Sequence, residues 1–429
     1  MDVRCPLGTE DILPEQALVW QKVERAARGV FARYGYGEIR TPIFESTRLF
    51  VRSIGETTDI VEKEMYTIGE GDDSLTLRPE ATAPVVRAYL QHNLHKTKAF
   101  QKLYYIGPMF RHERPQAGRK RQFHQIGVEA IGATDPLLDA EVIHLACRFF
   151  HEIGLAGYTV RLNAIGTPES RGAYRDLIKA ELSAQADALC PDCRRRLDRN
   201  VFRALDCKNR GCIAITRKLP RILDHLPQAE RDHFDRVCDA LRAAGTDFQE
   251  DPYLVRGFDY YTGTVFEVTH SGLGSQDALC GGGRYDNLIA DLGGPSLGAV
   301  GFAMGVERIL MALEATAEAA EGPGLDIYLV CLGDAARLAA FGHCTALRQA
   351  GLSADTDYEG RSLKAQMRTA NKLRARHVVL LGDNELASGV LKLKNMATSE
   401  ETELPDVHAV IREIRGRGGE GAGGIDLNP

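Results

Sequence analysis

The stretch F-R-H-E-R-P-Q-A-G-R-K-R-Q-F-H-Q-I-G-V-E, residues 110–129, decides the fold of this chain. The aromatic and β-branched run L-Y-Y-I at 103–106 leads into it, and Phe123, Ile126 and Val128 lead out of it. Between the two runs, Pro115 and Gly118 are residues typical of turns. The sequence therefore predicts two antiparallel strands joined by a loop.

Polar residues on the two predicted strands share one face. Arg111 falls at an odd-numbered position, as do Gln125 and Glu129, and the two-residue period of a strand places odd-numbered residues of each strand together. A sheet face that carries these side chains is a poor core. It indicates a polar site.

The loop of this hairpin is strongly basic. Residues 109–121 contain five Arg or Lys and one Glu, a net charge of +4. Guanidinium groups match the geometry of phosphate and carboxylate, so the charge indicates an anionic ligand. An exposed, solvated hairpin is the alternative, and the polar strand face argues against it.

Composition limits the class of protein. The chain has 429 residues, a net charge of -6 and ten cysteines. The negative balance argues against a general nucleic-acid binder, so any such contact must come from local basic faces. No apolar run approaches the roughly 18 residues that span a bilayer, and residues 1–5 lack the apolar core of a secretory signal. Scattered cysteines favour a reducing compartment. We expect a cytoplasmic protein without a membrane segment.

The hairpin resembles motif 2 of the class II aminoacyl-tRNA synthetases, which carries F-R-x-E. The longer strings F-R-H-E-R-P-Q-x-G-R at 110–119 and R-Q-F-H-Q-x-G-x-E at 121–129 are similar to the histidyl-tRNA synthetase family. Further strings follow in the family's order, and the resemblance covers about residues 4–412. They are a helix and strand before Pro42 (motif 1), L-R-P-E-A-T at 77–82, L-V-R-G-F-D-Y-Y at 254–261, G-G-G-R-Y-D at 281–286, and motif 3 at 297–310.

This resemblance implies an α+β fold with a class II catalytic domain on a mainly antiparallel sheet. We expect the catalytic domain at 1–167 and 248–320. A charged, helical composition predicts an insertion domain at 168–247, and a linker composition falls at 315–324. Alternating strand and helix patterns predict a C-terminal α/β anticodon-binding domain at 325–415, followed by a flexible tail at 416–429.

The implied activity is ATP-dependent ligation of L-histidine to tRNA(His) through histidyl-adenylate, with ATP as substrate, Mg²⁺ as its companion and a homodimer as the working form. Arg111 and Arg256 are the implied catalytic residues, one on each side of the α-phosphate. The implied histidine-binding residues are Glu80, Thr82, Arg111, Gln125, Glu129, Arg256, Tyr260, Tyr261 and Tyr285. The implied ATP-binding residues are Arg111, Glu113, Arg119 and Arg308.

Within that set the resemblance implies distinct roles. Glu129 and Tyr261 would read the two imidazole nitrogens, while Glu80, Thr82 and Gln125 would take the amino group. Tyr260 and Tyr285 would line the pocket.

Several of these residues also have purely structural alternatives. Glu80 could complement a helix dipole. Arg256 could form an ion pair with Asp259 or another acid that merely holds the loop. Arg308 could form a helix-capping pair with the neighbouring Glu307.

Contacts to tRNA are expected at two places. The resemblance implies that Gln116 in the motif 2 loop reaches the acceptor stem. Residues 361–376 contain six Arg or Lys and no acid, and we expect this basic helix to contact the phosphate backbone rather than to be merely a solvated face. Its expected contact residues are Arg361, Lys364, Arg368 and Lys372.

Four cysteines of the predicted insertion, Cys190, Cys193, Cys207 and Cys212, form a C-x2-C-x13-C-x4-C pattern. That spacing is compatible with tetrahedral zinc. The alternative is that the thiols pack or remain free, and at this stage we favour that alternative and expect no metal.

Two other functions compete with the enzyme. Regulatory subunits of ATP phosphoribosyltransferase share this catalytic fold, but they lack the C-terminal domain and several signature residues. This chain keeps Arg256, the Tyr260–Tyr261 pair and a basic C-terminal region. A bare RNA-binding scaffold fits less well, because the polar constellation suits a small-molecule pocket.

Overall fold

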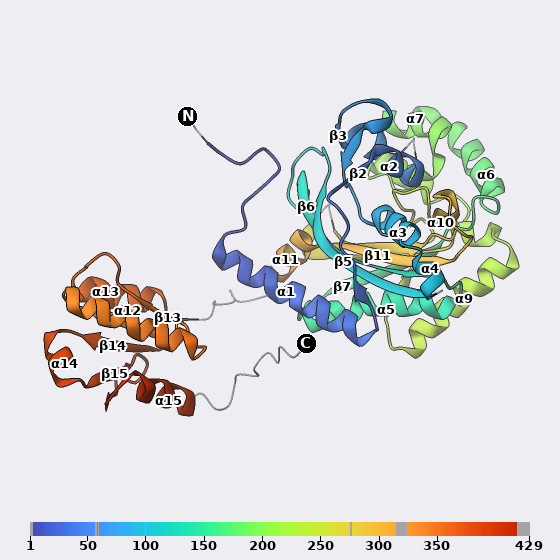
Figure 1. Cartoon of the computed structure of the whole chain (residues 1–429). Helices are drawn as coiled ribbons and strands as arrows, with labels where there is room; N and C mark the ends of the chain where they lie inside the picture. Colours follow the sequence, from blue (N-terminus) through green and yellow to red (C-terminus); the bar gives the residue numbers. More distant parts are fainter. Residues whose placement is uncertain are drawn as a thin grey trace. The chain divides into compact units, whose positions relative to one another are not determined.

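The computed structural model describes residues 3–55, 58, 60–98, 100–274, 277–314 and 324–417 (Figure 1). The chain forms two compact units, Met1–Ala320 and Glu321–Pro429. Of the predicted linker at 315–324, only Gly324 lies within the described residues, and of the predicted tail only residues 416 and 417 do. No helix in the described ranges has the length and apolar character that crossing a bilayer requires.

An eight-stranded sheet forms the centre of the first unit, in the order β1-β5-β6-β11-β10-β9-β7-β8. Neighbouring strands are antiparallel except the pairs β1–β5 and β7–β8. This arrangement confirms the predicted α+β class. The strands are β1 (Gly37–Glu38), β5 (Gln101–Phe110), β6 (Gln122–Ile131), β7 (Tyr158–Ala164), β8 (Gln249–Glu250), β9 (Thr264–His270), β10 (Ala278–Arg284) and β11 (Ala299–Gly305).

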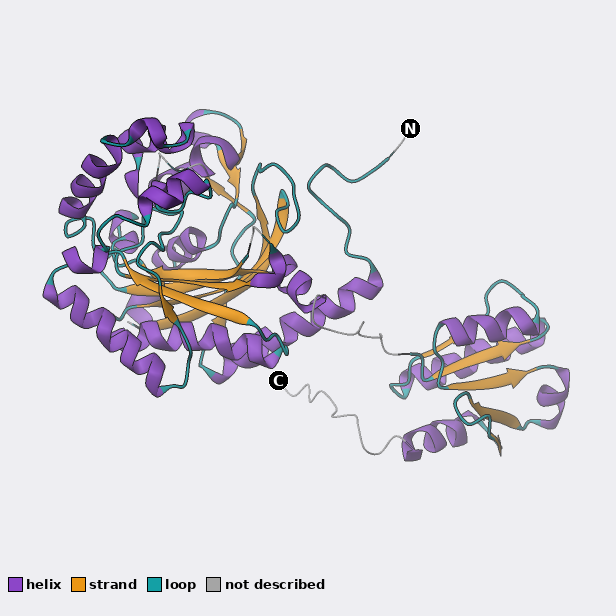
Figure 2. Cartoon of the chain, turned by 180° about the vertical axis from the view of Figure 1, so that it is seen from behind, coloured by secondary structure: helices purple, strands orange, loops and turns teal. Residues whose placement is uncertain are grey.

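Long helices cover one face of this sheet, as Figures 1 and 2 show from opposite sides. They are α1 (Pro14–Arg33), α5 (Pro136–Glu152) and α9 (Gln228–Ala243), with α5 packed against both of the others. Proline occupies the first turn of α1 and of α5, where its missing N–H costs no hydrogen bond. Phe31 of α1 packs between Phe149 of α5 and Phe302 of β11, with ring centroids 6.2 and 6.3 Å away. The core therefore fills that side and leaves the opposite face of the sheet for the site.

A smaller sheet, in the order β2-β4-β3, lies in the same unit. Its strands are β2 (Phe44–Ser46), β3 (Tyr66–Ile68) and β4 (Leu75–Leu77), and the neighbouring helices are α2 (Thr47–Ile54), α3 (Thr82–Gln91) and α4 (Leu94–Thr97). Thr76 of β4 is fully buried on one face, whereas Phe44, Ile68 and Leu75 are exposed. The exposed face is therefore apolar.

The chain between β7 and β8 is helical, with α6 (Gly172–Ser183), α7 (Pro191–Arg199), α8 (Arg210–Thr216) and α9. Its buried residues, among them Tyr174, Ile178 and Phe234, belong to the same hydrophobic core as the large sheet. After β9, α10 (Leu288–Asp291) and α11 (Val306–Glu314) complete the first unit.

The second unit is a five-stranded mixed sheet, in the order β13-β12-β14-β15-β16. β12 is parallel to both neighbours, and the remaining pairs are antiparallel. Buried residues of α12 and α15 share one apolar cluster with the sheet, while Ala370 of α13 packs with Tyr328 and Val330 in another. The elements are β12 (Ile327–Cys331), α12 (Asp334–Gln349), β13 (Ala354–Thr356), α13 (Leu363–Lys372), β14 (His377–Leu381), α14 (Asp383–Ser388), β15 (Leu391–Asn395), β16 (Glu401–Leu404) and α15 (Val407–Arg417).

Candidate active site

The floor of the site is a row of small residues across the large sheet. Gly127 of β6 lies opposite Ala303 of β11, which lies opposite Gly281 of β10, which in turn lies opposite Glu267 of β9. A Cβ at Gly281 would overlap the Arg256 guanidinium, and one at Gly127 would overlap the Tyr105 ring. Glycine is therefore required here because side chains from other segments approach the backbone closely.

Glu129 lies two residues along β6 from Gly127, opposite Gly301 of β11, and is almost fully buried. Both of its carboxylate oxygens are engaged: Thr82 Oγ1 donates to Oε1 at 2.7 Å, and the Tyr285 hydroxyl donates to Oε2. A Cβ at the facing Gly301 would overlap the same carboxylate. Burial raises the pKa of Glu129 to about 8, against the opposing effect of the two hydroxyl donors.

Glu80 fixes the start of α3. Its carboxylate accepts the backbone N–H groups of Thr82 and Ala83, at 2.7 and 2.9 Å. This capping interaction is the structural role weighed from the sequence, and it coexists with a place on the cavity wall. Burial raises the pKa of Glu80, although these two donors and Arg111 oppose the rise.

Tyrosines close the pocket around these acids. Tyr260 stacks on Phe258, with ring centroids 5.1 Å apart and planes at 7°, and it meets Tyr285 edge-on at 5.6 Å. Burial raises the pKa of Tyr260 and of Tyr285 well above the ordinary value, so both stay neutral hydroxyls. The side-chain oxygen of Gln125 is buried there without a hydrogen-bond partner among the described residues. Gln125 lines the cavity, so a ligand donor could satisfy this buried acceptor.

Arg256 is held against the sheet floor by Glu267, with Nη1 2.5 Å from Oε1. The structural alternative, an ion pair with Asp259 or another acid, is thus present, with Glu267 as the acid. Asp259 Oδ1 instead accepts from Asn200 Nδ2 at 2.9 Å. Burial alone would lower the pKa of Arg256, but the Glu267 carboxylate outweighs burial and raises it. The guanidinium is thus a fixed, permanent cation at the cavity wall.

Arg111, directly after β5, also lines the cavity. Its Nε donates to the carbonyl of Pro79 at 2.9 Å, and its guanidinium carbon lies 5.3 Å from the Phe123 ring and 5.9 Å from the Phe258 ring. Glu113 stands beside it and pairs with Arg119, whose Nη1 lies 3.0 Å from Oε2. Two aromatic faces and a carbonyl orient Arg111, so its remaining nitrogens can face an anion.

Arg308 of α11 also reaches the cavity. It donates to the carbonyls of Gly118 and Ala278, at 2.9 and 2.8 Å. The predicted alternative of a pair with Glu307 is wrong, because the Glu307 carboxylate accepts the backbone N–H of His124 at 3.0 Å and also contacts its ring nitrogen Nδ1. Burial lowers the pKa of Arg308, and Arg119 lowers it further. Both effects favour an anion beside it.

One cavity of about 300 Å³ collects the small-molecule residues predicted from five separate segments. Its lining includes Glu80, Thr82, Arg111, Glu113, Arg119, Gln125, Glu129, Arg256, Tyr260, Tyr261, Tyr285 and Arg308. Acids gather around Glu129, and cations gather around Arg111. The cavity can therefore hold a small polar molecule with a cationic group at one end and phosphates at the other.

Glu267 and Phe258 are among the cavity residues that sequence reasoning missed. A signal for Glu267 was present, since it is the one carboxylate in the strand Thr264–His270. Phe258 sits within the signature string and could have been read as a stacking partner for Tyr260.

The residues predicted to contact tRNA lie elsewhere. Gln116 is exposed at the tip of the β5–β6 hairpin, where its backbone bonds to Arg119 close the turn at 3.1 and 2.9 Å. Lys364, Arg368 and Lys372 are exposed on α13 of the second unit. Arg361 differs, because its Nε lies 2.6 Å from the buried carboxylate of Asp357.

Comparisons with known proteins match both units. The family model described as histidyl-tRNA synthetase matches residues 8–309, and the one described as anticodon binding domain matches residues 326–416.

Individual relatives are similar along almost their whole length. A histidine–tRNA ligase of Halothermothrix orenii is 50% identical over 406 residues, which is 94% of this chain and 97% of that protein. One of Trichlorobacter lovleyi is 49% identical over 414 residues, covering 96% and 98%. The crystal structure of apo S. aureus histidyl-tRNA synthetase matches with a TM-score of 0.79 and 37% identity, over 96% of this chain and 100% of that one.

Proposed function

This chain belongs to the histidyl-tRNA synthetase family, and we propose that the cavity described above is where it activates histidine. The reaction of the family joins histidine to tRNA(His) at the expense of ATP, through histidyl-adenylate, and releases AMP and diphosphate. The observation that carries the assignment is the convergence of acids and hydroxyls at one end of a single cavity and of arginines at the other.

The acidic end accepts histidine. Glu129 and the hydroxyl of Tyr261 face the imidazole, because one carboxylate and one hydroxyl satisfy a ring donor and a ring acceptor. Thr82 and Tyr285 keep the carboxylate of Glu129 in place through their hydroxyl bonds. The ammonium group lies among Glu80, Thr82 and Gln125, where the unpartnered oxygen of Gln125 supplies an acceptor.

The basic end aligns the reacting groups. In the first step an oxygen of the histidine carboxylate attacks the α-phosphorus of ATP, and the bond from that phosphorus to the diphosphate oxygen breaks. Arg111 bridges the carboxylate and the α-phosphate, while Arg256 faces the α-phosphate from the sheet floor. Because both guanidinium groups are fixed before substrate arrives, they stabilise the developing charge without reorganisation.

ATP occupies the remaining arginine wall. Arg308 and Arg119 face its outer phosphates, and Glu113 orients Arg119. Glu113 and Glu307 line the same cavity and offer carboxylate oxygens of the kind that Mg²⁺ prefers, so they would hold it beside the phosphates. When bound, the ion would neutralise charge on the phosphate oxygens. In the second step, a terminal ribose hydroxyl of tRNA attacks the aminoacyl carbonyl, and AMP leaves.

Contacts to tRNA outside the cavity follow from exposure and charge. Gln116 at the hairpin tip reaches the acceptor stem, and the exposed cations of α13 meet backbone phosphates. We assign the catalytic domain to residues 1–167 and 248–320, a helical insertion to 168–247 and an anticodon-binding domain to 325–415. The place of action is the cytoplasm.

The working form is a homodimer. The exposed face of the small sheet supports this assignment, because Ile68 and Leu75 are cross-strand partners and both are exposed, as are Ile43 and Phe44 beside them. A contiguous apolar face of this kind is typical of an interface. Sedimentation of the purified chain at micromolar concentration should give a dimer, and Ile68→Glu should give a monomer.

The decisive assay has two stages. Histidine-dependent exchange of labelled diphosphate into ATP tests adenylate formation, and charging of purified tRNA(His) tests transfer. We expect both activities with histidine alone among the amino acids. Binding of histidine without any exchange would instead favour a regulatory subunit of the ATP phosphoribosyltransferase type.

A further inference from the structure

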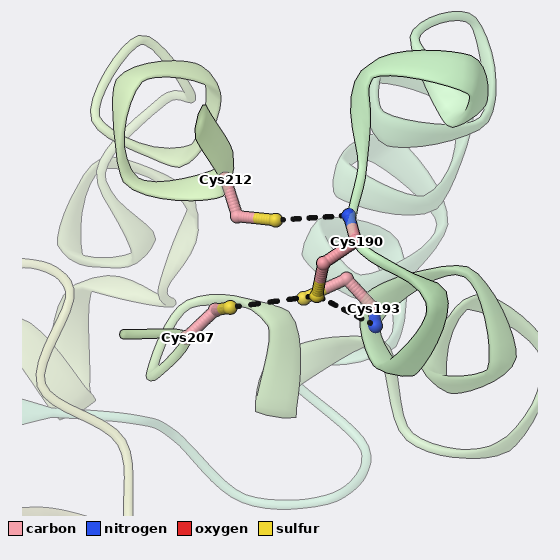
Figure 3. A group of neighbouring side chains, drawn as sticks. All are labelled: Cys190, Cys193, Cys207 and Cys212. Atoms are coloured by element: carbon pink, nitrogen blue, oxygen red, sulfur yellow. Dashed lines mark hydrogen bonds between the residues drawn. The ribbon is translucent and has the colours of Figure 1, made fainter. Parts of the chain in front are cut away.

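Four cysteines outside the active site converge on one point. Cys190 precedes α7 and Cys193 lies in its first turn, while Cys207 belongs to the following loop and Cys212 to α8. All four sulfur atoms lie within 4.8 Å of one another (Figure 3). Cys193 and Cys212 are fully buried, and the other two are half-buried. Segments up to 22 residues apart thus present their thiols to one shared volume.

The spacing of the sulfur atoms fits a tetrahedral metal site. Sγ of Cys190 lies 3.8 Å from Sγ of Cys207. Zn–S bonds of about 2.3 Å at tetrahedral angles place neighbouring sulfurs about 3.8 Å apart. All ten cysteines of the chain are free thiols. Four sulfurs facing one another are the arrangement that a four-ligand centre needs.

Backbone donors already point at three of these sulfurs. Cys212 Sγ accepts the N–H of Cys190 at 3.2 Å, Cys190 Sγ accepts that of Cys193 at 3.5 Å, and Cys207 Sγ accepts that of Asn209 at 3.4 Å. Such N–H···S bonds stabilise thiolate charge and orient ligands around a metal. A packed cluster of neutral thiols has little need of them.

The surrounding chain complements a negative centre. Residues 191–212 contain seven Arg or Lys and three Asp, a net charge of +4. Four thiolates with one divalent metal carry a charge of -2. The basic segment therefore offsets the charge that a loaded site would bring.

We propose that Cys190, Cys193, Cys207 and Cys212 bind one Zn²⁺ as a closed structural site. Soft thiolate ligands in tetrahedral array select zinc over magnesium or calcium, and four protein ligands leave no open position for catalysis. This geometry reverses our preference from the sequence for metal-free thiols. The site joins α7 to α8, two helices of nine and seven residues that are too short to be stable alone.

The proposed site also fixes a loop that faces the active site. Between Cys193 and Cys207 lie Asn200, which donates to Asp259, and Arg203, whose Nη1 would be 3.2 Å from a Cβ placed at Gly257. Asp259 and Gly257 belong to the string that carries Arg256, Tyr260 and Tyr261. Closing the cysteine site therefore restrains residues that brace this string.

The test begins with the whole chain, purified without a metal-binding tag. Elemental analysis should find about one zinc per chain. Titration of the thiols with a mercurial reagent should release that zinc. Replacement by Co²⁺ should produce thiolate-to-cobalt charge-transfer absorption and the strong visible bands of a tetrahedral site. These readouts are independent of aminoacylation.

Matched variants locate the metal. Cys207→Ser should lose the zinc and the cobalt bands, whereas Cys238→Ser should keep both, because Cys238 is a buried thiol of α9 outside the cluster. If Cys207→Ser fails to fold, the analysis of the unmodified chain still decides. A reduced, metal-free chain that takes up no Co²⁺ would overturn the proposal. So would disulfides among these cysteines in the purified protein, or zinc retained by Cys207→Ser.

Discussion

The candidate active-site cavity and helix α13 both gather positive charge, but they hold it in opposite ways. Arg256 is largely buried and lies 2.5 Å from Glu267, and Arg111 is fixed by a carbonyl and two aromatic rings. Lys364, Arg368 and Lys372 are exposed along one stripe of α13, four residues apart.

The difference follows from solvation. A buried cation requires partners, and those partners fix its position to the accuracy that chemistry needs. An exposed cation is hydrated and mobile, so it adds attraction without fixed geometry. We therefore expect large effects from single substitutions in the cavity and small, salt-dependent effects from those on α13.

The largest effect is expected at Arg256. Arg256→Ala should slow single-turnover adenylate formation at saturating ATP and histidine by about 10²–10³-fold, as for removal of one transition-state donor. Arg256→Lys keeps the charge but loses the planar fork, so its rate should lie between those of the unmodified chain and Arg256→Ala. Rapid-quench measurement of adenylate gives the rate directly.

The structural alternative predicts a different pattern for the same variant. If Arg256 only holds Glu267 and its loop, Arg256→Ala should lower thermal stability and raise the KM for both substrates. Its turnover would then remain close to that of the unmodified chain. A near-normal single-turnover rate would remove Arg256 from catalysis.

The next effect is expected at Glu129. Glu129→Gln keeps the shape of the side chain but replaces a carboxylate by a weaker acceptor, so kcat/KM for histidine should fall by about 10²-fold. The KM for ATP should change little. Steady-state diphosphate exchange measures both, and equal losses for the two substrates would argue against the imidazole assignment.

Glu129 also makes a prediction about pH and stability. Its pKa is about 8 in the folded chain, whereas an ordinary glutamate has a pKa of 4.5. Between those values the folded state binds the extra proton, so the stability contributed by this group is present at low pH and is lost as pH rises. As the pH is raised from 5.5 to 8, the unfolding midpoint of the unmodified chain should therefore fall relative to that of Glu129→Gln. A constant difference would contradict the raised pKa.

A smaller, salt-dependent effect is expected on α13. Replacing Lys364 and Lys372 by Gln should leave diphosphate exchange intact and weaken tRNA(His) binding at low salt. The slope of log affinity against log salt should shrink by about one to two, because up to two phosphates are no longer neutralised.

Lys392 and Lys394 of β15 provide the matched control. They are also cations of the second unit, but they pair with Glu403 and Glu401 at 3.4 and 3.6 Å. Replacing both by Gln removes the same charge and should change the salt slope less. Equal changes in the two double variants would mean that net charge, rather than the α13 stripe, governs tRNA affinity.

The sequence could predict what depends on local pattern. The strand period placed Gln125 and Glu129 together, and both line the cavity. The absence of acids from residues 361–376 correctly indicated that the exposed cations of α13 lack acidic neighbours within that stretch. Arg361 is an exception in one respect, because it pairs with Asp357, which lies just before the stretch. Patterns within one segment are visible because the residues share one backbone geometry.

The contacts that the sequence could not predict are those between distant segments, which strand register and packing bring together. Glu267 meets Arg256 because β9 and β10 align Glu267 with Gly281, under the guanidinium. Glu307 binds His124 from 183 residues away, which removed it as a partner for Arg308. Thirteen residues separate Cys193 from Cys207, so the sequence likewise did not show that the two side chains lie close together. Partner choice of this kind is fixed by packing rather than by spacing along the chain.

The smallest effect is expected at Asn200, which links the cysteine-bearing region to the active site. Its Nδ2 donates to Asp259 at 2.9 Å, three residues after Arg256. Loss of one partly exposed hydrogen bond is worth about 1 kcal/mol, so Asn200→Ala should reduce adenylate formation by about fivefold. Because Asn200 acts by positioning the loop, kcat should fall more than KM rises.

The matched control is Gln185→Ala, which removes an exposed amide that donates to the carbonyl of Glu181 in the same helical region. Single-turnover rates of both variants, measured beside their thermal midpoints, separate positioning from stability. Asn200→Ala should be slower than Gln185→Ala even where the two variants have similar midpoints. Equal rates would show that Arg256 keeps its place without this brace, because the bond to Glu267 alone would then be sufficient to fix the guanidinium.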